Sequence, residues 1–497
     1  MLYLILVCVL AGAATACNDD GEPVGGTPTT SAVRTGGPGV PTPVVWTDCG
    51  DGFQCGSIPA PLDYDRPRRA TIDVALIRRP ASDPDARIGS LLVNPGGPGA
   101  SGVEFVRLAA DLFPEELQSR FDIVGFDPRG SGATMPIDCD FDLDAVFALD
   151  ATPDTIAERT ALERTNADLA DACAASNGRD LPFVTTQDTV RDMDRIRAAV
   201  GDEALTYLGY SYGTYLGALY ADRYPTHVRA MLLDGAVDPT LPAVESTLTQ
   251  AAGFEQSLEA FFADCASDSG CEFSSDGDPA AAFDDLVADI DATGVPADDG
   301  RTLGPGETDV AVASALYLGE TGYDELASAL AAAADGDGDP LLALSDSYTG
   351  RNDDGSYNGR QEAFWAIGCA DGGATVTNDA EQRDLERRAE AVSPHFGIAS
   401  VNLAMVCRYW PVPGEAPLEP VHADGAPPIV VIGTTGDPAT PLAWAESLAD
   451  QLQRGELVVV EGSQHGAFAL RTDECIDDIG VRYLVDLEVP PAGTMCG

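Results

Sequence analysis

Lysine is absent from this sequence, so all 28 of its basic residues are arginine, against 81 aspartates and glutamates. The formal net charge of −53 over 497 residues creates a strongly negative field. Such a field repels nucleic acids and anionic membrane surfaces, so we expect neither as a partner. The same acidity keeps a protein soluble.

Metal and cofactor signatures are missing as well. The twelve cysteines and four histidines include no CxxC pair and no His/Cys cluster with the spacing of a zinc site. No motif implies an organic cofactor. Beyond the first 16 residues, no apolar run is long enough to span a membrane. We therefore predict a protein without a metal, a cofactor or a transmembrane helix.

The N-terminus has the features of an export signal. Residues 1–16 form a short apolar stretch that ends in small residues, and Ala14-Thr15-Ala16-Cys17 resembles a bacterial lipobox. The segment departs from that pattern because it has no basic residue before the apolar stretch and Ala14 where leucine is usual. We predict a signal peptide over 1–17 with a lipid on Cys17, and simple secretion is the alternative. Residues 18–45 are rich in Gly, Pro and Thr and predict a flexible linker.

This interpretation places the protein outside the cytoplasm of a bacterium, as a cell-envelope lipoprotein or a secreted protein. The lipid on Cys17 would be its one membrane contact. If Cys8 leaves with the signal and Cys17 carries lipid, ten cysteines remain, an even number that predicts five disulfides. The sequence leaves their connectivity open. The simplest hypothesis pairs neighbours in order: Cys49–Cys55, Cys139–Cys173, Cys265–Cys271, Cys369–Cys407 and Cys475–Cys496.

A serine stands in a G-x-S-x-G pentapeptide, Gly209-Tyr210-Ser211-Tyr212-Gly213. The apolar run 205–208 precedes it and a helical segment, 214–223, follows it. In this strand–turn–helix context the pentapeptide predicts a nucleophile elbow, in which a sharp turn lifts the serine hydroxyl clear of a sheet. Small flanking glycines allow that turn. Ser211 is therefore the candidate nucleophile.

In that architecture the acid and then the histidine follow the serine in the chain. Among the four histidines, His227, His395 and His422 lie in turns or loops with no strand before them, whereas His465 follows the strand 456–460 across a short loop. A catalytic base on a loop at the carboxyl end of a strand has this setting. We predict His465 as the base.

The candidate acid is Asp437, because it follows the apolar, β-branched run 428–432, which predicts a buried strand. It would hold His465 in the correct tautomer. Asp424 is the nearest competitor, but it precedes the strand. The alternative for Asp437 is a structural one, in which it only begins the turn before Pro438.

An oxyanion hole needs a second backbone donor from the loop after an earlier strand. The run Leu91-Leu92-Val93 ends in a loop rich in Gly and Pro, 94–102. Glycine lets the main chain approach a substrate carbonyl. The predicted donors are the backbone N–H groups of Gly97 and Tyr212. An ordinary Gly-Pro turn is the alternative.

Five motifs together carry a family resemblance: Pro95-Gly96-Gly97-Pro98-Gly99, Asp127-Pro128-Arg129-Gly130, the elbow around Ser211, Asp234-Gly235-Ala236-Val237-Asp238-Pro239 and Gly436-Asp437-Pro438-Ala439-Thr440-Pro441. This set resembles the secreted tripeptidyl aminopeptidases, which belong with the proline iminopeptidases among the α/β-hydrolases. The similarity runs from about Trp46 to Cys496. It implies the same assignment of Ser211, Asp437 and His465. Proline iminopeptidases usually carry His where this chain has Pro95, which favours the tripeptidyl branch.

The expected fold is therefore that of an α/β-hydrolase, with a mostly parallel central sheet flanked by helices and an inserted, mainly helical cap. We assign residues 46–240 and 402–497 to the core and residues 241–401 to the cap, which would decide what enters the site. An aminopeptidase also needs an acid in the cap to hold the substrate's α-amino group. Asp371 and Glu320 are candidates, and the sequence does not choose between them.

The primary hypothesis is an exported serine exopeptidase that releases tripeptides or other short N-terminal units through an acyl-enzyme. Its partners would be peptides with a free N-terminus, and the oligomeric state is left open. An esterase or acyl hydrolase that uses the same triad is the first alternative. A non-catalytic surface lipoprotein that binds ligands under the cap is the second.

Overall fold

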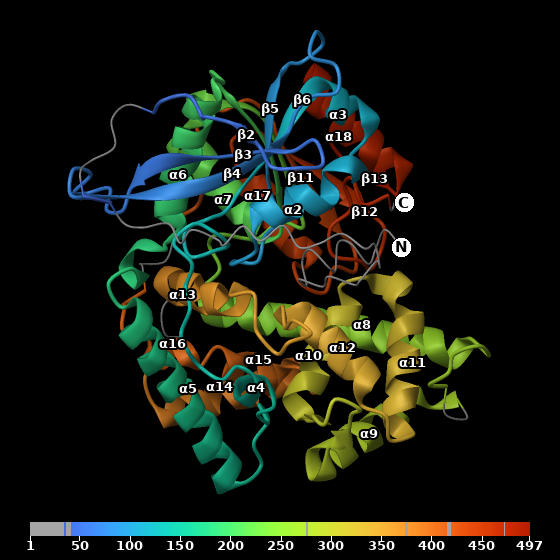
Figure 1. Cartoon of the computed structure of the whole chain (residues 1–497). Coiled ribbons are helices and arrows are strands. Elements are labelled where there is room, and N and C mark those ends of the chain that lie inside the picture. The colour runs from blue at the N-terminus through green and yellow to red at the C-terminus, as the bar shows by residue number, and fades with distance from the viewer. Residues whose placement is uncertain (1–33, 36–40, 275–276, 373–375, 415–418, 472) are drawn as a thin grey trace.

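The chain forms two layers, a sheet covered by helices and a helical layer beneath it (Figure 1). The computed structural model describes residues 34–35, 41–274, 277–372, 376–414, 419–471 and 473–497. The predicted signal peptide, Cys17 and most of the linker lie outside these residues. Within them, no helix is both long and apolar enough to cross a membrane.

The sheet is 11-stranded, with the order β13-β12-β11-β8-β7-β5-β6-β4-β3-β2 and β1 paired to β4. Neighbours from β13 to β6 are parallel, and β4, β3, β2 and β1 extend the sheet with antiparallel pairs. The strands are β1 (Arg34–Thr35), β2 (Thr47–Asp48), β3 (Gln54–Pro61), β4 (Ala70–Arg79), β5 (Gly89–Asn94), β6 (Phe121–Phe126), β7 (Leu205–Tyr210), β8 (Val228–Asp234), β11 (Ile429–Thr434), β12 (Gly455–Val460) and β13 (Thr494–Cys496). The mostly parallel sheet that the sequence predicts is confirmed.

Helices cover both faces of the sheet, which explains why its central strands are apolar on both sides. In β5, Leu92 packs into one apolar cluster, while Leu91 and Val93 pack into the other. The first cluster includes residues of α6 (Thr186–Val200), α7 (Tyr212–Arg223) and α17 (Leu442–Gln451). The second includes residues of α2 (Gly102–Ala109), α3 (Glu115–Arg120) and α18 (Glu474–Asp486).

Local signals set the ends of these helices. At the start of α6, the Thr185 side chain accepts a hydrogen bond from the Asp188 backbone N–H at 3.3 Å. At its end, Gly201 takes a left-handed conformation with φ of 92°, which glycine adopts without strain. The strands and helices predicted around the motifs are present, with ends shifted by a few residues.

Strand order places a crevice at one edge of the sheet. β5 lies between β6 and β7, so the chain leaves β5 toward one side and later returns to its other side. In open parallel sheets, ligands bind at the carboxyl ends of the strands, at such a reversal. The loops singled out in the sequence follow β5, β7, β11 and β12, and all emerge at that edge.

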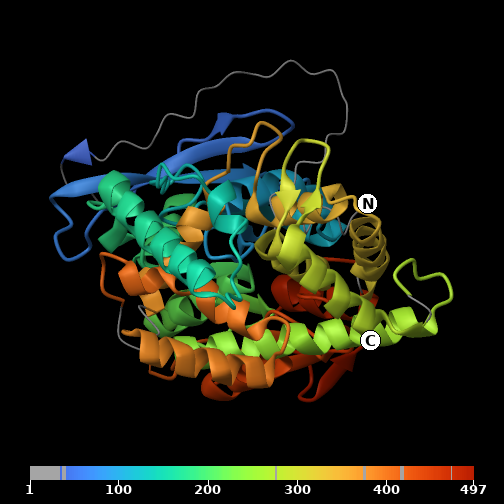
Figure 2. The same cartoon turned by 90° about the horizontal axis from the view of Figure 1, so that it is seen from below.

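The helical layer faces this edge (Figure 1). Seen from below, the long lime-green helix α8 runs across the layer with orange α14 beside it (Figure 2). The layer has an apolar core of its own, which includes Phe254, Leu316 and Leu330. Its later elements are α8 (Ala243–Ser267), α9 (Pro279–Thr293), β9 (Val295–Pro296), β10 (Thr302–Leu303), α10 (Pro305–Leu316), α11 (Tyr323–Ala334), α12 (Asp339–Thr349), α13 (Arg360–Gly372), α14 (Asp379–Val392), α15 (Gly397–Leu403) and α16 (Val406–Tyr409).

Two earlier helices lie in the same layer, α4 (Asp144–Phe147) and α5 (Ile156–Asn177) (Figure 1). Arg159 of α5 forms a two-pronged ion pair with Glu386 of α14, with a shortest distance of 2.6 Å. The layer is therefore wider than residues 241–401, because segments on both sides of that range contribute to it. The assignment of this layer to a cap that is separate from the core stays a prediction.

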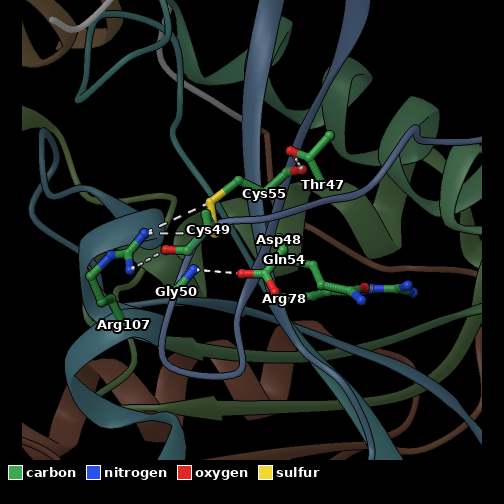
Figure 3. Close-up of a disulfide and its surroundings, with 8 residues drawn as sticks. All are labelled: Thr47, Asp48, Cys49, Gly50, Gln54, Cys55, Arg78 and Arg107. Carbon is green, nitrogen blue, oxygen red and sulfur yellow. Dashed lines mark hydrogen bonds between the residues drawn. A yellow bond between two sulfur atoms is a disulfide. The ribbon is translucent and has the colours of Figure 1, made fainter. Parts of the chain in front are cut away.

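The ten cysteines that the structure describes form five disulfides, in the neighbour-in-order pattern of the simplest hypothesis. In Figure 3, the Cys49–Cys55 disulfide closes the turn between β2 and β3, and the Arg107 guanidinium of α2 reaches the Cys49 carbonyl oxygen at 3.5 Å. Disulfides persist in oxidising compartments, so this set fits a location outside the cytoplasm.

Arg129, from the Asp127–Gly130 motif, is fully buried and holds the antiparallel edge of the sheet to α6. Its Nε and Nη2 donate to the Asp192 carboxylate at 2.6 and 3.0 Å. Further bonds run to the carbonyl oxygens of Pro61 and Leu62. Arg129 also lies 3.7 Å from the Asp188 carboxylate. Loss of Asp192 would leave the buried guanidinium with this longer contact, and breaking a buried pair costs about 3–5 kcal/mol. This motif is therefore structural.

Candidate active site

Ser211 occupies a strained turn between β7 and α7. Its φ is 53° and its ψ is −125°, a backbone conformation that is rare for residues other than glycine. Two neighbours hold the turn: the Ser211 N–H donates to the Asp234 carbonyl at 2.9 Å, and the Thr214 hydroxyl donates to the Ser211 carbonyl at 2.6 Å. This is the geometry of a nucleophile elbow.

The glycines of the pentapeptide are required by close approach of the backbone. A Cβ on Gly209 would lie 2.4 Å from the Gly213 carbonyl oxygen, and one on Gly213 would lie 2.8 Å from the Asn94 carbonyl oxygen. Either contact is too short for a real side chain. The helix after Ser211 therefore packs tightly onto β7 and onto the end of β5, which brings the loop after β5 close to the serine.

Asp437 and His465 form a buried pair. The imidazole Nδ1 lies 2.9 and 2.8 Å from the two carboxylate oxygens, and because a carboxylate only accepts, Nδ1 donates. The same carboxylate accepts the backbone N–H groups of Ala439 and Thr440 at 2.9 Å each and the Thr440 hydroxyl at 2.8 Å. No described residue is hydrogen bonded to Nε2, so this nitrogen keeps its lone pair available.

The charge of Asp437 changes the basicity of His465. Burial disfavours the imidazolium, but the Asp437 carboxylate and its hydrogen bond outweigh that effect and raise the pKa of His465 overall. A base with a raised pKa accepts a proton more readily, and it is neutral and ready to do so only above that pKa.

Asp234, at the end of β8, connects the turn at Ser211 to the loop that carries His465. Its carbonyl accepts the Ser211 N–H, and its Oδ2 accepts the N–H groups of Ala467 and Phe468 at 2.8 Å each. The side chain is fully buried, and burial raises its pKa to about 6. Sequence reasoning assigned no role to this residue beyond its place in a family motif.

The loop after β5 lies against the elbow. Gly96 and Gly97 have φ values of 103° and 110°, and a Cβ on Gly96 would lie 2.8 Å from the Ser211 Cβ. The backbone N–H groups of Gly97 and Tyr212 are hydrogen bonded to no described residue. Tyr212 begins α7, where N–H groups lack an acceptor within the helix. Both predicted donors are thus available beside Ser211.

The helical layer contacts all of these loops. The Tyr317 carbonyl accepts the His465 N–H at 2.9 Å, and the Tyr317 ring meets the imidazole edge-on, with centroids 5.3 Å apart. Gln250 of α8 donates to the Ala439 carbonyl at 2.7 Å. A Cβ on Gly99 would lie 2.5 Å from the Arg360 carbonyl oxygen, so the start of α13 packs closely against the loop after β5. The layer therefore forms part of the site.

Between the two layers lies a cavity of about 370 Å³ that Gly97, Ser211 and His465 all line. This is the size of a small-molecule or short-peptide site. The rest of its wall comes mainly from the helical layer and is largely apolar. Its large side chains are Phe147, Phe254, Tyr317, Tyr348, Phe364, Trp365, Phe396 and Leu403.

Among the described residues of the cavity wall, two side chains besides His465 can carry a charge, Asp309 of α10 and Arg360 of α13. Burial raises the pKa of Asp309 to about 7, with the nearby Asp150 charge adding to the effect. The acids weighed from the sequence lie elsewhere. Asp371 accepts the N–H of Thr186 at 2.9 Å outside the cavity wall, and Glu320 is exposed. Sequence reasoning missed Asp309 because the chain has many acidic residues, and the residues around Asp309 form no pattern that sets it apart from the others.

Comparisons with known proteins agree with this geometry. A model described as alpha/beta hydrolase fold matches residues 89–276, and one described as TAP-like protein matches residues 393–496. Serine protease Hip1 of Mycobacterium tuberculosis is 38% identical, over 93% of this chain and 92% of its own. The chain belongs to the TAP-like family of α/β-hydrolases.

Two further relatives are named for different activities, one as an esterase and one as an aminopeptidase. Carboxylesterase B of Mycobacterium tuberculosis is 34% identical, over 89% of this chain and 86% of its own. Tripeptidyl aminopeptidase of Streptomyces lividans is 30% identical, over 88% and 84%. The predicted family, fold and enzyme class are confirmed: this member of the TAP-like family is a serine hydrolase of the peptidase type. The non-catalytic alternative is set aside.

The pairing of Asp437 with His465 generates a prediction about Ser211 reactivity. Asp437→Asn should slow labelling of Ser211 by a fluorophosphonate probe roughly 10⁴-fold, because an amide no longer holds the reactive tautomer. It should also move the acid limb of the pH profile to lower pH, since the variant loses the charge that raises the His465 pKa. Labelling rates measured against pH test both effects.

Two controls accompany that measurement. Ser211→Ala should abolish labelling, and Asp424→Asn, in the exposed acid before β11, should leave it unchanged. If Asp424→Asn rather than Asp437→Asn slowed the reaction, the assignment of the acid would be wrong.

Proposed function

We propose that this enzyme is an exported serine exopeptidase that releases tripeptides from the free N-terminus of peptides. The observation that carries this proposal is Asp309, an acid in the wall of the cavity that Ser211 and His465 also line. The family membership and the relatives named as peptidases support the reaction type. Asp309 supports the position of the cut.

The chemistry follows from the loops at the edge of the sheet. Ser211 Oγ attacks the peptide carbonyl, and His465 Nε2 takes its proton and passes it to the leaving amine. The Gly97 and Tyr212 N–H groups stabilise the oxyanion, and Asp437 stabilises the imidazolium. Water then attacks the acyl-enzyme in the same way and frees the N-terminal unit and Ser211.

Asp309 is suited to hold the substrate's ammonium group. It is the one carboxylate among the described residues of the cavity wall, and the wall is otherwise largely apolar. Charge pairs are stronger where water is excluded, so an ammonium group would bind there and restore the carboxylate to its charged form. An N-terminus that is acylated carries no such charge and would lose this interaction.

The spacing along α10 favours a unit of three residues. Asp309, Ala313 and Tyr317 follow one another at intervals of four on the same side of the helix, and all three line the cavity. At 1.5 Å per residue, Asp309 lies about 12 Å along the axis from Tyr317, which contacts His465. Three extended residues span about 10–11 Å. An amine at Asp309 would therefore leave the third peptide bond near Ser211.

An esterase is the second candidate, favoured by the relative named carboxylesterase B and by the apolar wall of the cavity.

Export is part of the primary proposal and is supported by the five disulfides. The lipid on Cys17 stays a proposal. In a bacterial host, the full chain should take up a radiolabelled fatty acid and fractionate with membranes, whereas Cys17→Ala should take up none. A wild-type chain without label would exclude the lipid.

A substrate profile tests the function directly. Peptides with a free amine should be cut after their third residue, while N-acetylated copies should react at least 10-fold more slowly in kcat/KM. The reason is that the charge-assisted bond to Asp309 is worth about 1.5–3 kcal/mol. Mass spectrometry of the products reads the position of the cut, and Ser211→Ala is the blank. Turnover of short p-nitrophenyl esters without cleavage of any free-amine peptide would favour the esterase.

Asp309→Asn tests the residue that carries the proposal. It should raise KM for free-amine tripeptide substrates about 10-fold or more and abolish the difference between free and acetylated copies. In the wild type, the ratio of kcat/KM for free-amine to acetylated peptides should rise with pH through about 7, because only ionised Asp309 pairs with the amine. The ratio cancels the titration of His465, and its rise should vanish in the variant. Asp324→Asn, in an exposed acid of α11, is the matched control. An unchanged KM would disprove the role of Asp309.

A further inference from the structure

Arg360 has no carboxylate partner among the described residues, although acids outnumber bases by 81 to 28 in this chain. It lines the cavity, and its Nη1 is buried with no hydrogen-bond partner. Its guanidinium forms no ion pair with a carboxylate in the described parts of the chain. A buried charge without a partner is unfavourable, so such a group in the wall of a cavity is a candidate for binding a ligand.

Aromatic residues hold Arg360 in place. Its guanidinium carbon lies 5.3 Å from the centroid of the Tyr348 ring, in a cation–π contact. The Tyr348 hydroxyl lies 3.3 Å from the Tyr317 hydroxyl, and the Tyr317 ring packs against His465. This row of contacts links the cation to the catalytic base. The exposed Glu104 is the acid whose charge acts on Arg360, but the two form no ion pair.

Arg360 is connected to the carboxyl end of α10, whereas Asp309 lies further toward the amino end of that helix. Tyr317, at its carboxyl end, connects to Arg360 through Tyr348, whereas Asp309 lies about 12 Å back along the axis. If the substrate amine lies at Asp309, the acylating residues extend from Asp309 toward Ser211. The leaving group must pass beside His465, which returns its proton. The cation therefore lies on the leaving-group side.

We propose that Arg360 binds a carboxylate of the substrate on the leaving-group side of the scissile bond, an inference that rests on the proposed function. A guanidinium matches a carboxylate with two parallel hydrogen bonds. The carboxylate has two possible sources. It is the C-terminus of a one-residue leaving group, as in a tetrapeptide, or the acidic side chain of the first residue after the cut.

Two substrate pairs distinguish these sources. The first is a tetrapeptide with a free C-terminus and its C-terminal amide. The second is a longer, amidated peptide with Asp or Asn directly after the third residue. For each pair, the ratio of kcat/KM is measured on one enzyme, so that a general loss of activity cancels. The enzymes are the wild type, Arg360→Gln, Arg360→Lys and Arg68→Gln, which changes an exposed arginine in the loop between β3 and β4.

We expect the wild type to prefer the carboxylate form about 10-fold in at least one pair, which identifies the source. Arg360→Gln should bring that ratio close to one, Arg360→Lys should keep part of it, and Arg68→Gln should keep all of it. Thermal denaturation verifies that the variants fold. Equal ratios in the wild type and Arg360→Gln for both pairs would overturn the proposal.

A second measurement separates this proposal from the proposed function. If the wild type cuts no peptide, the exopeptidase proposal fails, and Arg360 is tested on p-nitrophenyl acetate hydrolysis instead. Free leucine should then inhibit more strongly than leucinamide, and Arg360→Gln should remove the difference. Equal inhibition by both compounds in the wild type would overturn the role of Arg360 independently of any peptidase activity.

Discussion

The site depends on the parallel register of neighbouring strands. Because β5, β7, β8, β11 and β12 are adjacent and run in one direction, their carboxyl ends meet at one edge of the sheet. Loops far apart in the chain are brought together there. Asp234 joins two of them, since its carbonyl holds the turn at Ser211 and its carboxylate holds the backbone just after His465. A shift of β8 would therefore move nucleophile and base together.

The helical layer adds a second constraint on the same loops. Tyr317 binds His465 through its carbonyl and its ring, and Gln250 binds the loop that carries Asp437. If the helical layer only covered the site, mutations in that layer would leave Ser211, Asp437 and His465 unaffected. Here the residues that would select substrate, Asp309 and Arg360, belong to helices that also support the base and the loop after β5. Binding and catalysis are thus coupled through packing.

Sequence reasoning was most specific where chemistry follows chain order. Ser211, Asp437 and His465 each follow a recognisable strand, and the structure places Asp437 within hydrogen-bond distance of His465. The catalytic roles of the three residues stay predictions. Sequence reasoning failed where the answer depended on distance across the fold. Asp371 and Glu320 were reasonable acids for the substrate amine, but one is bonded to Thr186 and the other is exposed. The contact between α5 and α14 is likewise invisible in the sequence, because the two helices are far apart in the chain.

The sequence by itself determined the family, the order of the catalytic loops and the even set of cysteines, since these depend on local patterns that survive without a fold. Tertiary structure alone decided which charges face the cavity. Asp309 and Arg360 resemble dozens of other acids and arginines in composition and neighbours. What distinguishes them is a place in the wall of the cavity that Ser211 and His465 also line, and this wall exists only once the helices have packed over the edge of the sheet.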